Sequence, residues 1–300
     1  MKKCKLLQIT VLSICLIWAV PELFAKKRSG IEADGLKKEI GLQLYSVRED
    51  MNRDVKATLD SVAAVGYTFV EAAGYSNGKF YGIDPIVFKN MVEASGMKLI
   101  SSHTGQDVPD EETWDECMEW WDEAIVAHKA AGFEYIVQPW MSAVGYESLD
   151  GLKRFCDYFN VVGEKCKAAG IKFGYHNHSG EFRMIDGKVI YDYMLANTDA
   201  DKVFFQIDVY WALAAGVDPT TYMEKYPGRF LLWHIKDVEE IGSSGKIDFE
   251  PIYDKAKIAG LQYAIVEQEA FGKGQTHFSS IARSLSFLRK AKYVKKSYCK

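Results

Sequence analysis

The fold is decided by one stretch of the sequence, GIKFGYHNHSGEF at residues 170–182. Gly170 follows a helical apolar pattern over residues 149–169 and is typical of a helix end, because glycine adopts a positive φ without steric strain. The aromatic and apolar run at residues 172–176 then predicts a short buried strand. Polar residues follow this strand at once. A helix end, a strand and a polar loop therefore follow one another within a few residues.

The same order of elements recurs along the chain. Eight strands are predicted, at residues 40–47, 68–73, 98–103, 135–140, 172–176, 203–208, 230–234 and 263–267. Helical patterns lie between them, among them residues 54–65, 85–94, 114–131, 149–169, 249–259 and 278–291. Strands that alternate with helices of this length predict parallel pairing through βαβ crossovers.

Eight such units over residues 39–292 predict an α/β fold, a single-domain (β/α)8 TIM barrel. The competing fold is an open doubly wound sheet that binds a nucleotide. That fold would normally carry a Gly-rich turn after its first strand, and neither such a turn nor a P-loop occurs in the sequence.

Composition and charge exclude several classes of protein. The chain has 300 residues, of which 48% are hydrophobic and 26% charged, values typical of a globular protein. Its 37 Lys and Arg face 41 Asp and Glu, for a net charge of −4. Because no basic excess is available to neutralise a phosphate backbone, nucleic acid is not an expected partner.

The first 25 residues predict a signal peptide. Lys2, Lys3 and Lys5 precede an apolar run at residues 6–20, which is shorter than the roughly 20 residues of a transmembrane helix. Cleavage after Ala25 would export the protein, and the expected location is the periplasm. An uncleaved membrane anchor is the alternative interpretation.

Two further segments flank the predicted barrel. Residues 26–38 form a charged N-terminal segment, and residues 293–300 form a C-terminal tail. No membrane contact beyond the export signal is expected, and a homo-oligomer is compatible with the sequence.

The cysteines show no disulfide framework or metal-binding pattern. The cysteines that follow the signal peptide have no C-x-x-C spacing, and they are Cys117, Cys156, Cys166 and Cys299. Buried thiols are the simplest interpretation, and a bridge across space stays open.

Polar residues gather at the predicted strand ends, where TIM barrels place their active sites. Of six histidines, four lie there: His103, His176, His178 and His234. His128 within a helix and His277 at the start of another are interpreted as structural. Candidate substrate contacts at the same ends are Gln43, Tyr45, Glu71, Gln138, Trp140 and Trp211.

Three of these strand-end residues suggest a metal site. Asp208, His234 and Glu267 end three consecutive strands, so their side chains can converge near the barrel axis. Buried carboxylates are costly unless something pairs with them, and a divalent cation would do so. The fifth strand should supply a fourth ligand, either Glu181 from the loop or His176 from the strand. With Glu181 the oxygen-rich set suits one Mn²⁺, Mg²⁺ or Co²⁺ ion, with Zn²⁺ also open.

Several strand endings together resemble those of a known family. Residues 175–182 (YHNHSGEF), 206–208 (QID), 234–237 (HIKD) and 266–269 (VEQE) are similar to the sugar phosphate isomerase/epimerase family of the xylose isomerase-like barrel superfamily. The opening strand IGLQLYS at residues 40–46 and the segment AGVDP at residues 215–219 extend the similarity over essentially the whole mature chain.

The resemblance implies a divalent metal held by a fifth-strand carboxylate together with Asp208, His234 and Glu267. The sequence departs from the common pattern because His176 stands where many members carry the first Glu. Trp211 also stands where some epimerases place a histidine that contacts substrate. These departures leave the fifth-strand ligand open and weaken the transfer of a simple two-carboxylate epimerase mechanism.

The expected chemistry is removal of a proton next to a carbonyl, with a metal-stabilised enediolate. Candidate catalytic residues are His103, His176, His178 and Lys236. We expect an isomerase or epimerase that acts on a non-phosphorylated sugar or keto-sugar, since an exported enzyme meets few sugar phosphates.

Three alternatives compete with this function. The first is a metal-dependent lyase or dehydratase of a keto-sugar or keto-inositol, and the second is a carbohydrate-binding barrel without catalysis. The superfamily also contains endonucleases for damaged DNA, but the acidic charge and the export signal disfavour that function.

Overall fold

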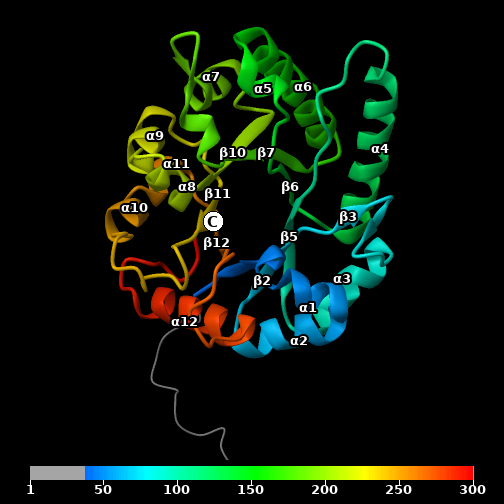
Figure 1. Cartoon of the computed structure of the whole chain (residues 1–300). Helices are drawn as coiled ribbons and strands as arrows, with labels where there is room; N and C mark the ends of the chain where they lie inside the picture. The colour runs from blue at the N-terminus through cyan, green and yellow to red at the C-terminus, as the bar shows by residue number, and fades with distance from the viewer. Residues whose placement is uncertain (1–37, 300) are drawn as a thin grey trace, which may run out of the picture. The chain divides into compact units, whose positions relative to one another are not determined.

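The computed structural model describes residues 38–299, which belong to one compact unit. Eight parallel strands close into a barrel in the order β1-β12-β11-β10-β7-β6-β5-β2 (Figure 1). Their bounds are β1 (Gly41–Gln43), β2 (Phe69–Ala72), β5 (Lys98–His103), β6 (Tyr135–Gln138), β7 (Lys172–His176), β10 (Val203–Asp208), β11 (Leu232–Ile235) and β12 (Tyr263–Val266). All eight predicted strands are present, and the single α/β barrel is confirmed. The first strand, predicted at residues 40–47, ends at Gln43, because residues 44–47 form a 3-10 turn. The predicted signal peptide at residues 1–25 lies outside the described residues, as does all but Lys38 of the charged segment.

Helices surround the barrel and shield its strands from water. They are α1 (Arg48–Arg53), α2 (Val55–Val65), α3 (Pro85–Ala94), α4 (Trp114–Ala131), α5 (Val144–Glu147), α6 (Leu149–Ala168), α7 (Ile190–Asn197), α8 (Val209–Ala214), α9 (Pro219–Lys225), α10 (Glu250–Asp254), α11 (Ala256–Ala259) and α12 (His277–Lys290). The predicted helix at 249–259 is divided into α10 and α11 at Lys255. None of the helices in residues 38–299 combines the length and apolarity needed to cross a bilayer.

The interior of the barrel, toward the amino ends of the strands, is filled by large apolar side chains. They form a separate cluster inside the strands, made of Phe69, Ile100, Tyr135, Val137, Phe204, Leu232 and Ile265. Two strand glycines make room for two of these rings. A Cβ on Gly41 would lie 2.1 Å from the Phe69 ring, and one on Gly174 would lie 2.6 Å from the Phe204 ring. Glycine at these positions is thus required by close packing.

Short insertions at the carboxyl end of the barrel were not predicted from the sequence. One hairpin, β3 (Tyr75–Ser76) with β4 (Lys79–Phe80), follows β2, and a second, β8 (Met184–Ile185) with β9 (Lys188–Val189), follows β7. Two 3-10 turns, η1 (Leu44–Val47) and η2 (Gly180–Phe182), follow β1 and β7. Two-residue strands are too short to leave an alternating pattern, and this is why sequence periodicity missed both hairpins.

The cysteines within residues 38–299 form no disulfide. Cys117, Cys156, Cys166 and Cys299 are all free thiols, and Cys156 and Cys166 are buried on α6. Burial raises the pKa of Cys156 to about 12. These two thiols are therefore inert parts of the core.

We predict that Gly174→Ala destabilises the barrel by about 1–3 kcal/mol, because the added methyl group must displace the buried Phe204 ring. Urea unfolding followed by circular dichroism measures the effect. The matched control is the same substitution in a Phe204→Leu background, where the smaller side chain leaves room. An equal loss of stability in both backgrounds would refute the packing explanation.

Candidate functional site

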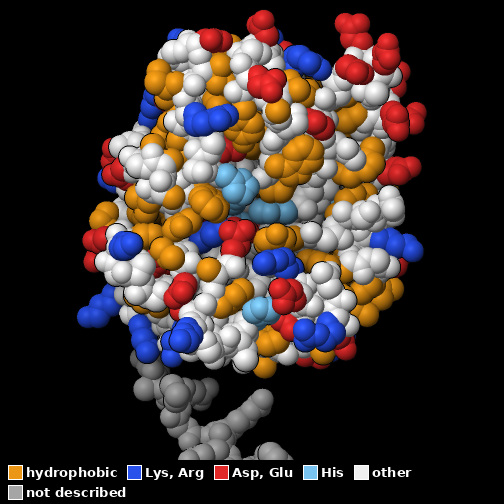
Figure 2. Space-filling view, in the orientation of Figure 1, with side chains coloured by type: hydrophobic (Ala, Val, Ile, Leu, Met, Phe, Trp, Pro, Cys, Tyr) orange, Lys and Arg blue, Asp and Glu red, His pale blue; other side chains and the backbone are white. Residues whose placement is uncertain are grey.

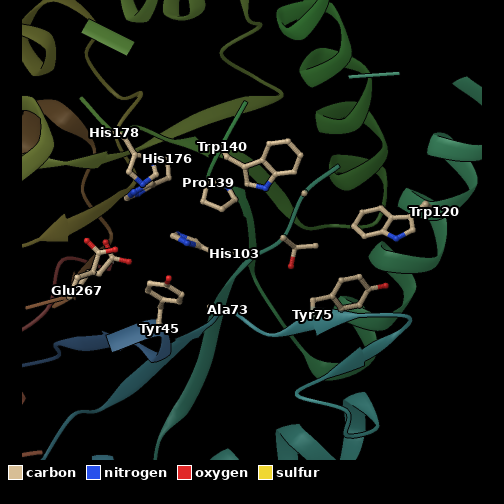
Figure 3. Close-up of a pocket in the computed structure, with 13 residues that line it drawn as sticks. Tyr45, Ala73, Tyr75, His103, Trp120, Pro139, Trp140, His176, His178 and Glu267 are labelled. Atoms are coloured by element: carbon tan, nitrogen blue, oxygen red, sulfur yellow. The ribbon is translucent and has the colours of Figure 1, made fainter. Parts of the chain in front are cut away.

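A cavity opens at the carboxyl ends of the strands. Its volume is about 390 Å³, and it is lined by Tyr45, Ala73, Tyr75, His103, Thr104, Gly105, Trp120, Pro139, Trp140, His176, His178, Glu267 and Glu269 (Figure 3). In the space-filling view, histidine side chains lie at the centre of this face, with acidic side chains beside them (Figure 2). The cavity thus lies where barrel enzymes carry out their chemistry.

Four potential metal ligands converge at the floor of this region. His176, Asp208, His234 and Glu267 each offer one ligand atom, and these atoms all lie within 4.8 Å of one another. All four side chains are buried. His176 and Asp208 end β7 and β10, His234 is the last residue but one of β11, and Glu267 directly follows β12. These four strands are neighbours in the barrel, and Asp208 pairs with His234 in the β10–β11 register.

Asp208 has one carboxylate oxygen without a partner. Its Oδ1 accepts a hydrogen bond of 3.0 Å from the backbone N–H of Trp211 at the start of α8. Its Oδ2 is buried and makes no hydrogen bond. Burial raises the pKa of Asp208 to about 7, although the Lys236 ammonium opposes the shift. Because a buried oxygen without a partner is costly, the site fits a cation bound at Oδ2.

His234 directs one ring nitrogen toward the other potential ligand atoms. Its Nε2 lies 2.6 Å from Glu71 Oε1, while Nδ1 lies 3.3 Å from Glu267 Oε2 and makes no hydrogen bond. Burial lowers the pKa of His234, but the Glu267 and Glu71 carboxylates outweigh burial and raise the pKa to about 10. Near neutral pH both ring nitrogens therefore carry protons, with Nε2 donating to Glu71 and Nδ1 facing Glu267. A metal ion bound at Nδ1 would displace the Nδ1 proton and leave the Nε2 proton on the bond to Glu71. This is the carboxylate–histidine arrangement common around metal centres.

Glu71 is the hub of a polar layer beneath the cavity. Besides His234, its oxygens accept hydrogen bonds from Gln43 Nε2 at 2.7 Å, from Ser101 Oγ and from Gln206 Nε2 at 2.8 Å. Burial alone would raise the pKa of Glu71, but His103 and His234 lower it to about 2. Gln43 and Glu71, predicted as substrate contacts, therefore support the site from below instead of lining the cavity.

Gln206 fixes the tautomers of two histidines. Its Nε2 donates to Glu71, so its Oε1 must accept from His103 Nε2 at 2.7 Å and from His176 Nδ1 at 3.1 Å. Burial lowers the pKa of both histidines, which are therefore neutral. The lone pairs are left on His103 Nδ1 and His176 Nε2. Each atom can accept a proton or a metal ion.

Glu181 lies outside the four-residue group. Its carboxylate accepts hydrogen bonds from Tyr146 Oη at 2.6 Å, Tyr175 Oη at 2.7 Å and the His178 backbone N–H at 2.9 Å. These three bonds hold the loop after β7 in place. Of the two fifth-strand alternatives, the structure brings His176 to the other ligands and leaves Glu181 in a structural position.

Lys236 is a buried cation beside the four potential metal ligands. Its Nζ lies 3.4 Å from Glu267 Oε2, contacts Glu269 Oε2 and sits 4.8 Å from the centre of the Trp211 ring. Burial lowers the pKa of Lys236, but Glu267 and Asp208 raise it above its usual value. Burial raises the pKa of Glu267, but His234 and Lys236 hold it well below its usual range. Glu267 is thus an ionised carboxylate.

The remaining predicted contacts divide into two groups. Tyr45, Trp140 and His178 line the cavity, as do the catalytic candidates His103 and His176. Gln138 and Trp211 do not line it. Gln138 Nε2 donates to the backbone oxygens of Gln106 and Trp140, at 2.8 and 3.0 Å, and shapes the loop after β6, while the Trp211 ring packs beside His178 and Lys236.

Among the lining residues that were not predicted from the sequence, two are large and aromatic. Tyr75 comes from the unpredicted hairpin, and Trp120 comes from α4, where its neighbour Trp121 is fully buried in the core. The only signal was the pair of adjacent tryptophans, since a helix directs successive side chains to different faces. His128 and His277, interpreted as structural, lie away from the cavity lining, His128 in the core and His277 against Asp50.

The fold and the site define a class of protein. The family described as "Xylose isomerase-like TIM barrel" matches residues 59–291, and the chain belongs to this family. A crystal structure of a sugar phosphate isomerase/epimerase from Parabacteroides distasonis is 37% identical, with 86% of this chain and 100% of that chain covered and a TM-score of 0.80. A second one from the same organism is 36% identical, with 89% and 98% covered and a TM-score of 0.82.

More distant similarities extend to two reaction types. The 3-keto-D-glucoside 4-epimerase of E. coli shares the fold at 18% identity and a TM-score of 0.64, with 85% of this chain and 100% of that chain covered. An inosose dehydratase of Lacticaseibacillus casei is 25% identical over 144 residues, or 40% of this chain. The chain spans about half the length (48%) of that curated relative.

We predict that Glu71→Gln lowers the affinity of the site for Mn²⁺ or Zn²⁺ by about 10–100-fold, because the amide no longer fixes the ring orientation of His234. Isothermal titration calorimetry on apoprotein measures the affinity, and circular dichroism checks the fold. Ser101→Ala is the matched control, since it removes one bond to Glu71 without touching His234. Unchanged metal affinity in Glu71→Gln would contradict the positioning role.

Proposed function

We propose that this protein is a divalent-metal-dependent isomerase or epimerase that acts on a non-phosphorylated sugar or keto-sugar. The observation that carries the proposal is the unpartnered, buried Oδ2 of Asp208 among four converging ligands at the cavity floor. A structural polar layer would have supplied that oxygen with a donor, as the layer around Glu71 does for both of its oxygens.

The ligand set would be His176, Asp208, His234 and Glu267. Two imidazole nitrogens and two carboxylate oxygens suit Mn²⁺, Co²⁺ or Zn²⁺ better than Mg²⁺, which prefers oxygen ligands alone. A cation bound there would polarise the substrate's carbonyl and hydroxyl oxygens and favour loss of the neighbouring proton.

The chain's own residues would move that proton. His103 is a neutral imidazole on the cavity wall with its Nδ1 lone pair free, and His178 lines the cavity beside His176. One can accept the proton as base while the other acts as acid, a contribution of about 10²–10⁴-fold for a positioned group. Lys236, against Glu267 and Glu269, keeps the carboxylate of Glu267 ionised.

The charge of the cavity supports a substrate without phosphate. Among its lining residues, all within the described part of the chain, none is Arg or Lys, and Glu267 and Glu269 are acidic. A phosphate dianion would be repelled by these carboxylates without a compensating donor cluster. A neutral sugar would instead bind through hydrogen bonds and by stacking on Tyr45 and Trp140.

A second candidate function is a lyase or dehydratase of a keto-sugar or keto-inositol. Two observations favour it: an imidazole, His176, stands where many relatives carry a carboxylate, and the inosose dehydratase similarity covers part of the chain. An epimerase returns a proton to the same carbon from the opposite face, whereas a lyase expels a hydroxyl group from the adjacent carbon. Export to the periplasm, expected from residues 1–25, is part of both proposals.

The reaction test uses a panel of free aldoses, ketoses and keto-sugars in D₂O, with product identification by NMR and mass spectrometry. We expect deuterium next to the carbonyl, abolished by a chelator and restored by metal. An isomer or epimer of equal composition would support the first function, and loss or gain of water the second. Binding of sugars without turnover of any of them would contradict both and leave a carbohydrate-binding barrel.

We also predict that His176→Ala and Glu181→Gln distinguish the residue that binds the metal from the residue that only holds the loop after β7 in place. Loss of His176 removes a ligand nitrogen and should cut metal occupancy sharply, as measured by metal analysis of the purified protein. Glu181→Gln should keep the metal, since its oxygens are bound by Tyr146, Tyr175 and His178. The reverse result would return the ligand role to Glu181.

A further inference from the structure

The cavity continues beyond the groups that would handle the sugar. The polar residues His103, His176, His178 and Glu267 lie on one side, while Tyr75 and Trp120 lie on the other (Figure 3). We call Tyr75 and Trp120 the aromatic end of the cavity. Both side chains are only partly buried, so each keeps surface that a ligand can cover.

We propose that the natural substrate is a keto-glycoside, a glycoside whose sugar ring carries the carbonyl group that the proposed reaction requires, and that the aromatic end binds its apolar or aromatic substituent. The inference rests on the proposed function, because it assumes that the sugar ring occupies the polar side. It adds a second binding site for a part of the substrate that does not react.

The chemistry of the two sides differs in the way that such a substrate requires. A pyranose ring is covered with hydroxyl groups, which match the imidazoles and carboxylates of the polar side. At the aromatic end, the rings of Tyr75 and Trp120 meet edge to face, with centroids 5.6 Å apart and planes at 81°. Ala73 and Gly105 add only small groups there. A hydroxyl-rich ring would leave this surface unfilled, whereas an aromatic or alkyl group would bury it.

The volume of the cavity agrees with a ligand larger than one sugar ring. Pockets for drug-sized molecules have volumes of about 300–1,000 Å³, and this cavity of about 390 Å³ falls within that range. Trp140 lies between the two sides in the same lining (Figure 3). One ligand can therefore extend from Glu267 to Trp120 without leaving the cavity.

The hairpin β3–β4 holds the aromatic end in place. Tyr81, which follows it, has a φ of 52°, a strained value for a residue other than glycine. Its hydroxyl accepts a 2.8 Å hydrogen bond from the Ala73 N–H, and its ring packs so closely on Gly74 that a Cβ there would lie 2.5 Å away. Tyr75 is fixed in turn by the rings of Phe80 and His128, at 5.3 and 4.9 Å. The position of Tyr75 is thus fixed by the hairpin and by the core beneath it.

The test measures binding to the metal-loaded full-length protein by isothermal titration calorimetry. Its ligands are matched pairs of phenyl and methyl β-glycosides of glucose, galactose, mannose and xylose. For at least one sugar we expect the phenyl glycoside to bind roughly tenfold more tightly than the methyl glycoside, as one well-packed aromatic contact allows. Trp120→Ala should abolish this preference and leave methyl glycoside binding unchanged. Trp120→Phe should restore part of it.

The matched control is Trp114→Ala, on the same helix but against a different hollow formed with Pro109 and Arg154. It should change neither affinity. Equal affinities for phenyl and methyl glycosides across the panel, or no binding of either, would overturn the inference. So would an equal loss for both ligands in Trp120→Ala.

Failure of the proposed function would look different. A phenyl preference that depends on Trp120, in a protein without metal-dependent turnover, would uphold the aromatic end and remove the catalytic proposal. Turnover of free sugars without any phenyl preference would do the opposite.

Discussion

The hydrogen bond between His234 Nε2 and Glu71 Oε1 joins two layers of polar side chains at the carboxyl end of the barrel. The lower layer surrounds Glu71, and the upper layer is the group of four potential metal ligands. Below it, Glu71 accepts hydrogen bonds from side chains of three further strands, β1, β5 and β10, and is a buried anion with donors to both of its oxygens. Above it, His234 is held with Nδ1 directed at Glu267. Because a buried carboxylate without donors would be strongly destabilised, the lower layer must form as a unit. The orientation of the upper layer follows from it.

The acidic groups of the upper layer are not fully paired with donors or cations. Glu267 is ionised and paired with His234 and Lys236, yet Asp208 keeps one oxygen without a donor and a pKa of about 7. Lys236 is already engaged by Glu267 and Glu269, so it cannot also satisfy that oxygen. A cation that contacts His176, Asp208, His234 and Glu267 would remove the imbalance, and this is the physical basis for proposing a metal-dependent reaction.

Sequence reasoning predicted the barrel and the convergence of Asp208, His234 and Glu267 because both follow from periodicity and from the rule that parallel strands end on one face. It could not choose between His176 and Glu181, since the choice depends on Tyr146, which comes from a short helix outside the predicted pattern. Gln43 and Glu71, predicted as substrate contacts, lie beneath the cavity and are not among the residues that line it. Alternation along a strand gives the direction of a side chain, not its height relative to a cavity. Tyr75 and Trp120 were missed because long-range packing alone brings them together.

The division of the cavity also explains how a generic proton-abstracting centre could become selective. Interactions at the polar side depend on hydroxyl and carbonyl groups that many sugars share, so they discriminate weakly between related substrates. Contacts with a non-reacting substituent add binding energy that can be used to hold the sugar ring in its reactive orientation. Under the two proposals, those contacts would come from an inserted hairpin and one helix face, elements that can vary without disturbing Glu71 and its layer. Substrate choice and catalysis would thereby belong to separate parts of the same fold.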